Sequence, residues 1–209
     1  MKLRHITESI DYATIWQNQD FLNKLQQFGV NIRIPPKADS HRGPHGQVFY
    51  IGDKAIKITA NANEAKLAEI YAAKVPEYVA VLGVFPVDNY YCIVQKKLDK
   101  VGWVYDQPFD AVKNYIWQTP RNELAIAFQS VPDDKIYQLL EIKAKTIPVI
   151  TYHLERIETE EQMLALSYIW KLLREIYAKT GYIVSDLKSE NFGFDGELLK
   201  IIDLDEVKR

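Results

Sequence analysis

The chain has 209 residues, 47% of them hydrophobic, and its 26 Lys and Arg against 28 Asp and Glu give a net charge of −2. This length can bury a sizeable core, in one large domain or in two lobes that share a cleft. The near-neutral charge, with no run of Lys and Arg longer than two, argues against a general nucleic-acid binder, and a single cysteine, Cys92, excludes an intrachain disulfide.

Targeting signals are not evident in the sequence. No apolar stretch is long enough to span a bilayer, and the beginning of the chain lacks the apolar core of a signal peptide. We therefore expect a soluble cytoplasmic protein without a membrane partner, with delivery into another cell left open. Cys92 lies in the apolar run 90–94 and is expected to be a buried small hydrophobe.

The first half of the chain predicts a helix followed by strands. Apolar residues recur at roughly helical spacing over 11–28, and Gly29 can end that helix. The polar stretch 37–46 is expected to be a loop. Strands are then predicted at 47–51, 54–59, 79–84 and 90–96, with a helix at 64–74 that Asn61 or Asn63 can cap.

The second half is expected to be mainly helical. Prolines interrupt residues 99–158, where we expect one helix near 110–117 and another within 122–145. From Thr159, apolar residues three and four apart predict one long helix with a core-facing stripe of Met163, Leu166, Trp170, Leu173 and Tyr177. Thr159 and Gln162 can form a capping box, and Gly181 can end the helix.

Near the carboxyl end, two hydrophobic strands each run into an aspartate. The strands are predicted at 182–184 and 198–202, and the aspartates are Asp186 and Asp203. Lys188 and Asn191 lie between them. Together these side chains supply what phosphoryl transfer needs, namely a base, a phosphate contact and two metal ligands.

The segment 186–191, which reads DLKSEN, resembles the catalytic loop of protein kinases of the Ser/Thr type. The resemblance implies that Asp186 accepts the proton of the acceptor hydroxyl, that Lys188 steadies the transferred phosphoryl group, and that Asn191 binds Mg²⁺. Asp203 stands where the family keeps its other metal-binding residue. The family motif Asp-Phe-Gly is Asp-Leu-Asp here, which is similar to antibiotic and choline phosphotransferases.

The upstream half carries weaker parts of the same resemblance. Ala55-Ile56-Lys57 resembles the strand with the phosphate-binding lysine. Glu64, which shares a helix face with apolar residues, is the expected partner of Lys57, and Glu69 on another face is the second choice. The resemblance thus implies that Lys57 and Glu64 belong to an ATP site.

Two further segments are implied to contact the nucleotide. Gly43 and Gly46 flank a loop whose backbone N–H groups could cover the phosphates. The run 91–94 followed by Gln95, Lys96 and Lys97 resembles the last strand and the hinge that receives adenine through backbone groups. We therefore expect Gln95 and Lys97 to bind the cofactor.

The fold that the resemblance implies is α+β and two-lobed, like that of protein kinases. We expect an N-terminal helical extension over 1–36, a small antiparallel β-rich N-lobe over 37–97 and a reduced helical C-lobe over 98–209. The C-lobe would contain an atypical helical insertion at about 99–158. The chain departs from the family before Asp186, where Val184-Ser185 replaces His-Arg, and ends six residues after Asp203. Activity should therefore not need activation-loop phosphorylation, as in compact bacterial and effector kinases.

The sequence thus predicts a kinase that uses ATP and Mg²⁺ to phosphorylate a hydroxyl of a protein substrate, with Ser or Thr favoured. Two alternatives stay open: a small-molecule phosphotransferase of the aminoglycoside or choline kinase type, and a pseudokinase that acts as a binding module. Trp103, Tyr115 and Trp117 could line an acceptor pocket, although packing in the core is favoured.

Overall fold

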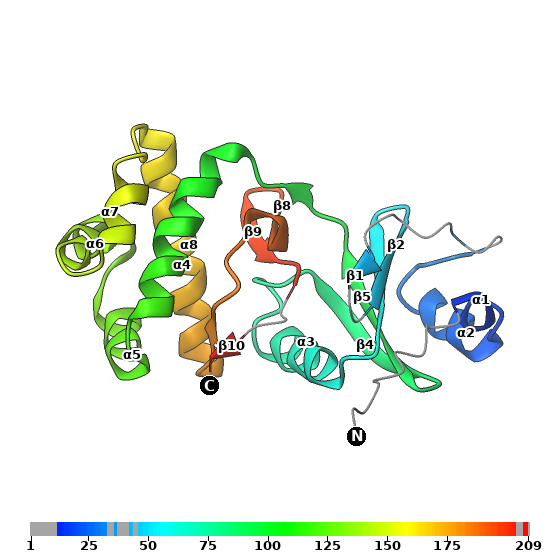
Figure 1. Cartoon of the computed structure of the whole chain (residues 1–209). Helices are drawn as coiled ribbons and strands as arrows, with labels where there is room; N and C mark the ends of the chain where they lie inside the picture. Colours follow the sequence, from blue (N-terminus) through cyan, green and yellow to red (C-terminus); the bar gives the residue numbers. More distant parts are fainter. Residues whose placement is uncertain (1–11, 33–35, 37–41, 44–45, 204–206, 209) are drawn as a thin grey trace, which may run out of the picture. The chain divides into compact units, whose positions relative to one another are not determined.

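The computed structural model describes residues 12–32, 36, 42–43, 46–203 and 207–208 (Figure 1). The chain divides into two compact units, one made of residues 1–65 and 82–97 and the other of residues 66–81 and 98–209. Residues 66–81, which the predicted domains place in the N-lobe, group with the second unit. The predicted N-terminal extension and helical insertion stay predictions.

The first unit contains a sheet with the strand order β1-β2-β3-β5-β4, in which the β1–β2, β2–β3 and β3–β5 pairs are antiparallel. Its strands are β1 (Arg42–Gly43), β2 (Gly46–Ile51), β3 (Lys54–Thr59), β4 (Val81–Val87) and β5 (Tyr90–Lys96). Gly52 joins β2 to β3 at a φ of 60°, a left-handed conformation that glycine adopts without strain. With the helices described below, this sheet makes the protein an α+β protein, as predicted.

A hydrophobic core lies between this sheet and the helices α1 (Tyr12–Ile15) and α2 (Gln19–Gln26). Alternate residues of β3, Ile56 and Ile58, belong to this core because side chains of a strand point to opposite faces in turn. Cys92 is fully buried in it, as predicted, and burial raises the pKa of its thiol.

The helix predicted over 11–28 is wrong as a single element. Residue 11 lies outside the described residues, and the remainder forms two helices that are separated near Asn18. The Asn18 Oδ1 accepts hydrogen bonds from the backbone N–H groups of Asp20 and Phe21, at 3.0 and 3.2 Å. An asparagine side chain satisfies N–H groups at the start of a helix better than it fits a helix interior, so a new helix begins there.

The second unit is mainly helical. Helix α3 (Ala62–Lys74) begins in the first unit and continues into the second. The other elements are a 3₁₀ turn η1 (Trp103–Tyr105), α4 (Asp106–Gln118), α5 (Arg121–Ser130), η2 (Asp133–Lys135), α6 (Ile136–Ala144), α7 (Pro148–Leu154) and α8 (Glu160–Thr180). The one helix expected within 122–145 is in fact two, because the chain turns at Pro132 and η2.

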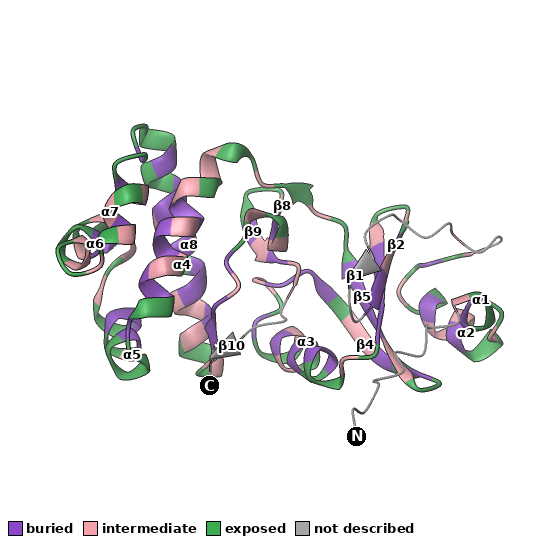
Figure 2. Cartoon of the chain, viewed as in Figure 1, coloured by how far each residue is buried: buried purple, intermediate pink, exposed green. Residues whose placement is uncertain are grey.

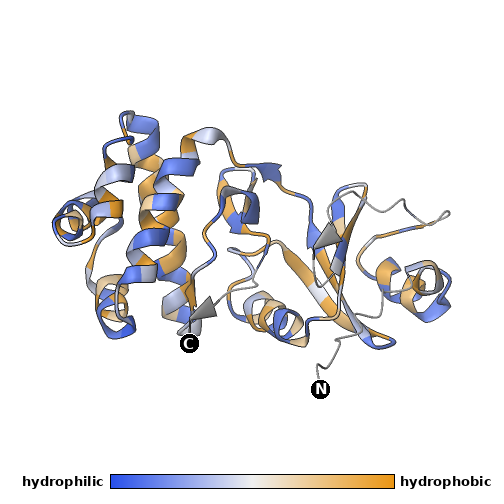
Figure 3. Ribbon diagram, in the orientation of Figure 1, coloured by the Kyte–Doolittle hydropathy of each residue, from blue (hydrophilic) through white to orange (hydrophobic). Residues whose placement is uncertain are grey.

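Helix α8 forms as the sequence predicts. The Thr159 hydroxyl accepts from the Gln162 N–H, the Gln162 side chain accepts from the Thr159 N–H, and Gly181 ends the helix at a φ of 70°. Trp170 on this helix is fully buried against the Phe128 ring of α5, with the ring centroids 4.7 Å apart. Most buried positions of α8 (Figure 2) are apolar (Figure 3), the exception being Gln162 of the capping box. The prediction fails at Met163, which is exposed.

Short strands complete the second unit. They are β6 (Asp99–Lys100), β7 (Ile183–Val184), β8 (Phe192–Asp195), β9 (Leu198–Ile201) and β10 (Val207–Lys208). β6, β8 and β9 form one antiparallel sheet, and β10 pairs with β7. A 3₁₀ turn, η3 (Ser189–Asn191), leads directly into β8.

The three aromatic residues singled out for an acceptor pocket or for the core separate in the structure. Tyr115 is buried, which raises the pKa of its hydroxyl to about 12. Trp103 and Trp117 are 73% and 53% exposed, so the expectation that they pack in the core is wrong for both. Trp103 begins η1, and Trp117 is the last residue but one of α4. Among the described helices, none has the length and apolar character needed to cross a bilayer.

Candidate functional site

In the first unit, the sheet and the start of α3 bring Lys57 and Glu64 together. Lys57 lies on the face of β3 opposite to Ile56 and Ile58, and its Nζ forms an ion pair with the Glu64 Oε1. The Lys57 side chain is 15% exposed and that of Glu64 is 4% exposed. The pair predicted from the sequence is therefore present, whereas Glu69, the second choice, is exposed.

The turn between β3 and α3 determines where Glu64 lies. The Asn61 Oδ1 accepts from the backbone N–H groups of Asn63 and Glu64, at 3.1 and 3.2 Å, and so caps the helix. The Thr59 hydroxyl donates to the Glu64 Oε2 at 2.9 Å and accepts from the Asn61 N–H at 3.0 Å. Both oxygens of the buried carboxylate thus have partners, which a buried ion pair requires for stability.

Thr59 is a residue that sequence reasoning missed. The sequence feature that could have indicated this residue is its position, because Thr59 follows Lys57 by two residues and therefore lies on the same face of β3. Threonine is common in strands, and nothing local marks its hydroxyl as the partner of a glutamate on the next helix.

The predicted phosphate loop is described only at its ends. Gly43 and Gly46 are partners across the β1–β2 pair, so the loop expected over 37–46 contains a short strand. Pro44 and His45 between them lie outside the described residues. A Cβ built on Gly46 would lie 2.4 Å from the Ile58 carbonyl oxygen, so close packing against β3 already requires glycine at this position.

Of the predicted hinge residues, Gln95 lies within β5 and Lys97 directly follows it. Gln95 is buried and pairs with Ala55 of β3. The Lys97 N–H donates to the Asp53 carbonyl at 2.8 Å, and the Lys97 Nζ lies 5.6 Å from the centre of the Tyr50 ring. Since that N–H is engaged by the β2–β3 turn, a backbone contact from Lys97 to a ligand would come from its carbonyl oxygen.

In the second unit, the loop after β7 brings Asp186, Lys188 and Asn191 together. The Asn191 Nδ2 donates to the Asp186 Oδ2 at 2.8 Å and to the Asp186 carbonyl at 3.2 Å. The Lys188 Nζ lies 3.2 and 3.3 Å from the two Asp186 carboxylate oxygens. The Lys188 side chain is 50% exposed while that of Asp186 is 15% exposed, so the lysine is the more accessible partner of the pair.

Apolar packing and one hydrogen bond from a distant helix hold the backbone of this loop. Leu187 is fully buried, and the Phe192 ring lies 4.4 Å from that of Phe109 on α4. The Trp117 indole N–H donates to the Ser185 carbonyl at 2.9 Å, immediately before Asp186. Trp117 therefore tethers the loop from a helix 68 residues away, a role that the sequence did not indicate.

Asp203 is held next to the same loop by its neighbours in the chain. The Ile202 N–H donates to the Asn191 carbonyl at 2.8 Å. Farther on, Val207 of β10 pairs with Val184 of β7. Asp203 is partly buried between these two attachments, while Asp205 and Glu206, two further acidic residues close behind it in the chain, lie outside the described residues.

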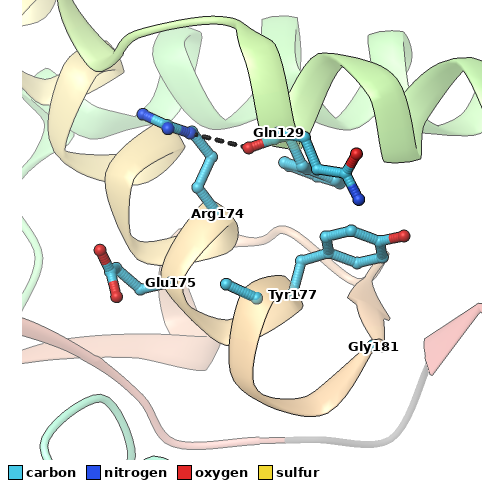
Figure 4. Close-up of a pocket in the computed structure, with 7 residues that line it drawn as sticks. Gln129, Arg174, Glu175, Tyr177 and Gly181 are labelled. Atoms are coloured by element: carbon cyan, nitrogen blue, oxygen red, sulfur yellow. Dashed lines mark hydrogen bonds between the residues drawn. The ribbon is translucent and has the colours of Figure 1, made fainter.

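A cavity in the second unit lies apart from these residues. It has a volume of about 570 Å³ and lies between α5 and α8, with Gln129, Arg174, Glu175, Tyr177 and Gly181 in its lining (Figure 4). Arg174 crosses it, donating from Nε to the Phe128 carbonyl at 2.9 Å and pairing with Asp133 at 2.7 Å. None of the predicted site residues lines this cavity.

The predicted residues therefore form two groups, one in each unit. The first offers a buried lysine–glutamate pair, and the second offers a carboxylate, an amide and a lysine in direct contact, with a further aspartate attached to the same turn. Carboxylate and amide oxygens are ligands that Mg²⁺ prefers. Within the described residues, no group of three or more His, Cys, Asp and Glu side chains is arranged to hold a metal ion. No protein-family model matches the chain, and no curated protein matches it either.

Proposed function

We propose that this protein is a kinase that uses ATP and Mg²⁺ to transfer the γ-phosphoryl group to a Ser or Thr hydroxyl of a protein substrate. The observation that carries the proposal is the contact of both Lys188 and Asn191 with the carboxylate of Asp186. Phosphoryl transfer depends mainly on positioning and on charge stabilisation, and this cluster supplies groups for both.

Each residue of the cluster has one task in the proposed reaction. Asp186 accepts the proton of the attacking hydroxyl, and Lys188, which is half exposed, neutralises the charge of the transferred group. Asn191 directs its Nδ2 toward Asp186, so its Oδ1 remains as the atom for a metal ion. Asp203 supplies the other metal ligand. The bound Mg²⁺ would offset the negative charge of the phosphates.

The first unit supplies the phosphate contact. Lys57 carries the positive charge, and Glu64 holds its amino group in one place, as the lysine–glutamate pair of protein kinases does. Gln95 and the carbonyl of Lys97 are the proposed adenine contacts, and the backbone N–H groups of the loop 43–46, in which Pro44 has none, are proposed to cover the phosphates. The close packing of Gly46 on β3 also explains why this position is a glycine, without any contact to a phosphate.

Two features support the finer parts of the proposal. Lys188 favours a protein acceptor over a small molecule, because a lysine at this position of the catalytic loop is part of the resemblance to Ser/Thr protein kinases. Ser185 stands where those kinases have the arginine that senses a phosphorylated activation loop, and its carbonyl is bonded by Trp117 instead. The proposed activity is therefore independent of activation-loop phosphorylation.

The test is transfer of labelled γ-phosphate with Mg²⁺ to a lysate or to the protein itself. The Asp186→Asn variant should lose roughly 10²–10⁴-fold in rate, the usual contribution of a general base. Asp195→Asn is a matched control, because Asp195 also pairs with a lysine of the second unit, Lys200 at 3.1 Å. Equal labelling by wild type and Asp186→Asn would refute the assignment of the base.

The same preparation separates the alternatives. The mass of the labelled product distinguishes phosphoryl from nucleotidyl transfer. ADP release with small alcohols or aminoglycosides, but not with proteins, would indicate a small-molecule phosphotransferase. ATP that raises the melting temperature without any transfer would indicate a pseudokinase.

A further inference from the structure

The connection from β3 to α3 is short enough to couple the lysine to its glutamate. β3 ends at Thr59 and α3 begins at Ala62, so only Ala60 and Asn61 lie between the two elements. Glu64 is in the first turn of α3, and its backbone N–H is already bonded to the Asn61 side chain. The backbone of Glu64 is therefore fixed next to β3, and only its side chain is left to be positioned.

Thr59 is the member of this turn whose hydroxyl donates to the Glu64 carboxylate. It is fully buried and pairs with Gly46 of β2 on one side and Tyr91 of β5 on the other. Because the side chain is fully enclosed and both neighbouring strands are paired with β3, there is little room for the threonine to move. The sheet thus fixes the hydroxyl that donates to the Glu64 Oε2.

We propose that Thr59 is a positioning residue that keeps the Lys57–Glu64 pair assembled when no nucleotide is bound. In protein kinases in general, this pair is a point of control, because the position of the helix that carries the glutamate decides whether it forms. Here the two-residue connection, the Asn61 cap and the Thr59 hydroxyl remove that freedom. The inference deepens the proposed function and rests on it for its meaning in catalysis.

The pair can be tested without any activity, by measuring how fast Lys57 reacts with an amine-specific reagent in the nucleotide-free protein. Lys54, on the same strand and with a side-chain exposure of 17% against 15%, is the internal reference. Thr59→Val removes the hydroxyl and keeps the shape, while Thr59→Ser keeps the hydroxyl. We expect Lys57 labelling, relative to Lys54, to rise several-fold in Thr59→Val and in Glu64→Gln, and to stay at the wild-type rate in Thr59→Ser.

If Lys57 reacts at the wild-type rate in Thr59→Val but faster in Glu64→Gln, the threonine does not hold the pair and the inference fails. The same conclusion follows if Lys57 and Lys54 both become more reactive in Thr59→Val, since that indicates general loosening. Should Thr59→Val not fold, Thr59→Ala provides the comparison with Thr59→Ser. These readouts are independent of phosphoryl transfer, so they stand even if the proposed function is refuted.

Catalysis gives a second readout when wild type is active. Thr59→Val should raise the KM for ATP or lower kcat about tenfold, with Thr59→Ser close to wild type, and should add little in a Glu64→Gln background. A merely structural role would instead lower the melting temperature by the same amount in both backgrounds and leave the KM for ATP unchanged. That result would overturn the proposal.

Discussion

Replacing Lys57 by methionine should destabilise the protein as well as inactivate it. The substitution keeps most of the apolar stem but leaves the Glu64 carboxylate, which is 4% exposed, without its cation. Removing one partner of a buried pair costs about 3–5 kcal/mol. Lys57 is 15% exposed and Thr59 still donates to Glu64, so the lower end, about 3 kcal/mol, applies here.

This free energy converts into a measurable shift of the melting temperature. A chain of this size loses about 2–4 °C for each kcal/mol, so Lys57→Met should melt about 6–12 °C below wild type. The assay is thermal unfolding followed by circular dichroism without nucleotide, where binding cannot contribute. Lys54→Met is the control, because its partner Asp53 is exposed and such surface pairs add little stability.

A second variant separates the charge from the packing. Combining Lys57→Met with Glu64→Leu removes the stranded carboxylate, and the apolar pair should recover most of the lost stability. The reasoning is refuted if Lys57→Met melts together with Lys54→Met, or if the double variant is less stable than Lys57→Met. A loss of activity in Lys57→Met can be assigned to chemistry only at temperatures where the variant remains folded.

Three further outcomes are expected. Trp117→Phe removes the N–H that donates to the Ser185 carbonyl. Steady-state kinetics should then show a severalfold lower kcat with an unchanged KM for ATP. Thermal unfolding should show a loss of about 1 kcal/mol in stability. Thr159→Ala breaks the cap of α8 and should cost about 1 kcal/mol in urea unfolding, whereas Thr159→Ser should cost little. Burial lowers the pKa of His153, so its contribution to the free energy of unfolding should be present above the usual histidine pKa of about 6.5 and be lost as the pH falls below that value. In His153→Gln the free energy of unfolding should depend less on pH in this range. An unchanged pH dependence would contradict the assignment.

The local parts of this protein could be predicted from its sequence because short-range chemistry determines them. The Thr159 capping box and Gly181 define α8, since a cap and a left-handed glycine act within one turn of the helix. The β2–β3 hairpin follows from alternating apolar residues on either side of a glycine turn. The Asp186 loop followed from residue types at fixed offsets.

The two helices at the beginning of the chain show where such patterns fail. The apolar spacing over 11–28 favoured one helix, yet the cap at Asn18 starts a second one. Periodicity marks the spacing of apolar residues and not the point where one helix ends and the next begins, so it could not distinguish one helix from two. Trp103 was assigned to the core from its type alone, whereas burial depends on what packs against a residue.

By itself, the sequence determined the β2–β3 hairpin, the long helix and the residue types at fixed offsets around Asp186, because each depends on neighbours within a few positions. Only the tertiary structure decided that Thr59 bonds Glu64, that Gly46 packs on Ile58, and that Trp117 bonds the residue before Asp186. Those contacts depend on strand register and on helix packing, which arise from burying apolar surface over the whole chain and leave no mark on the local residue pattern.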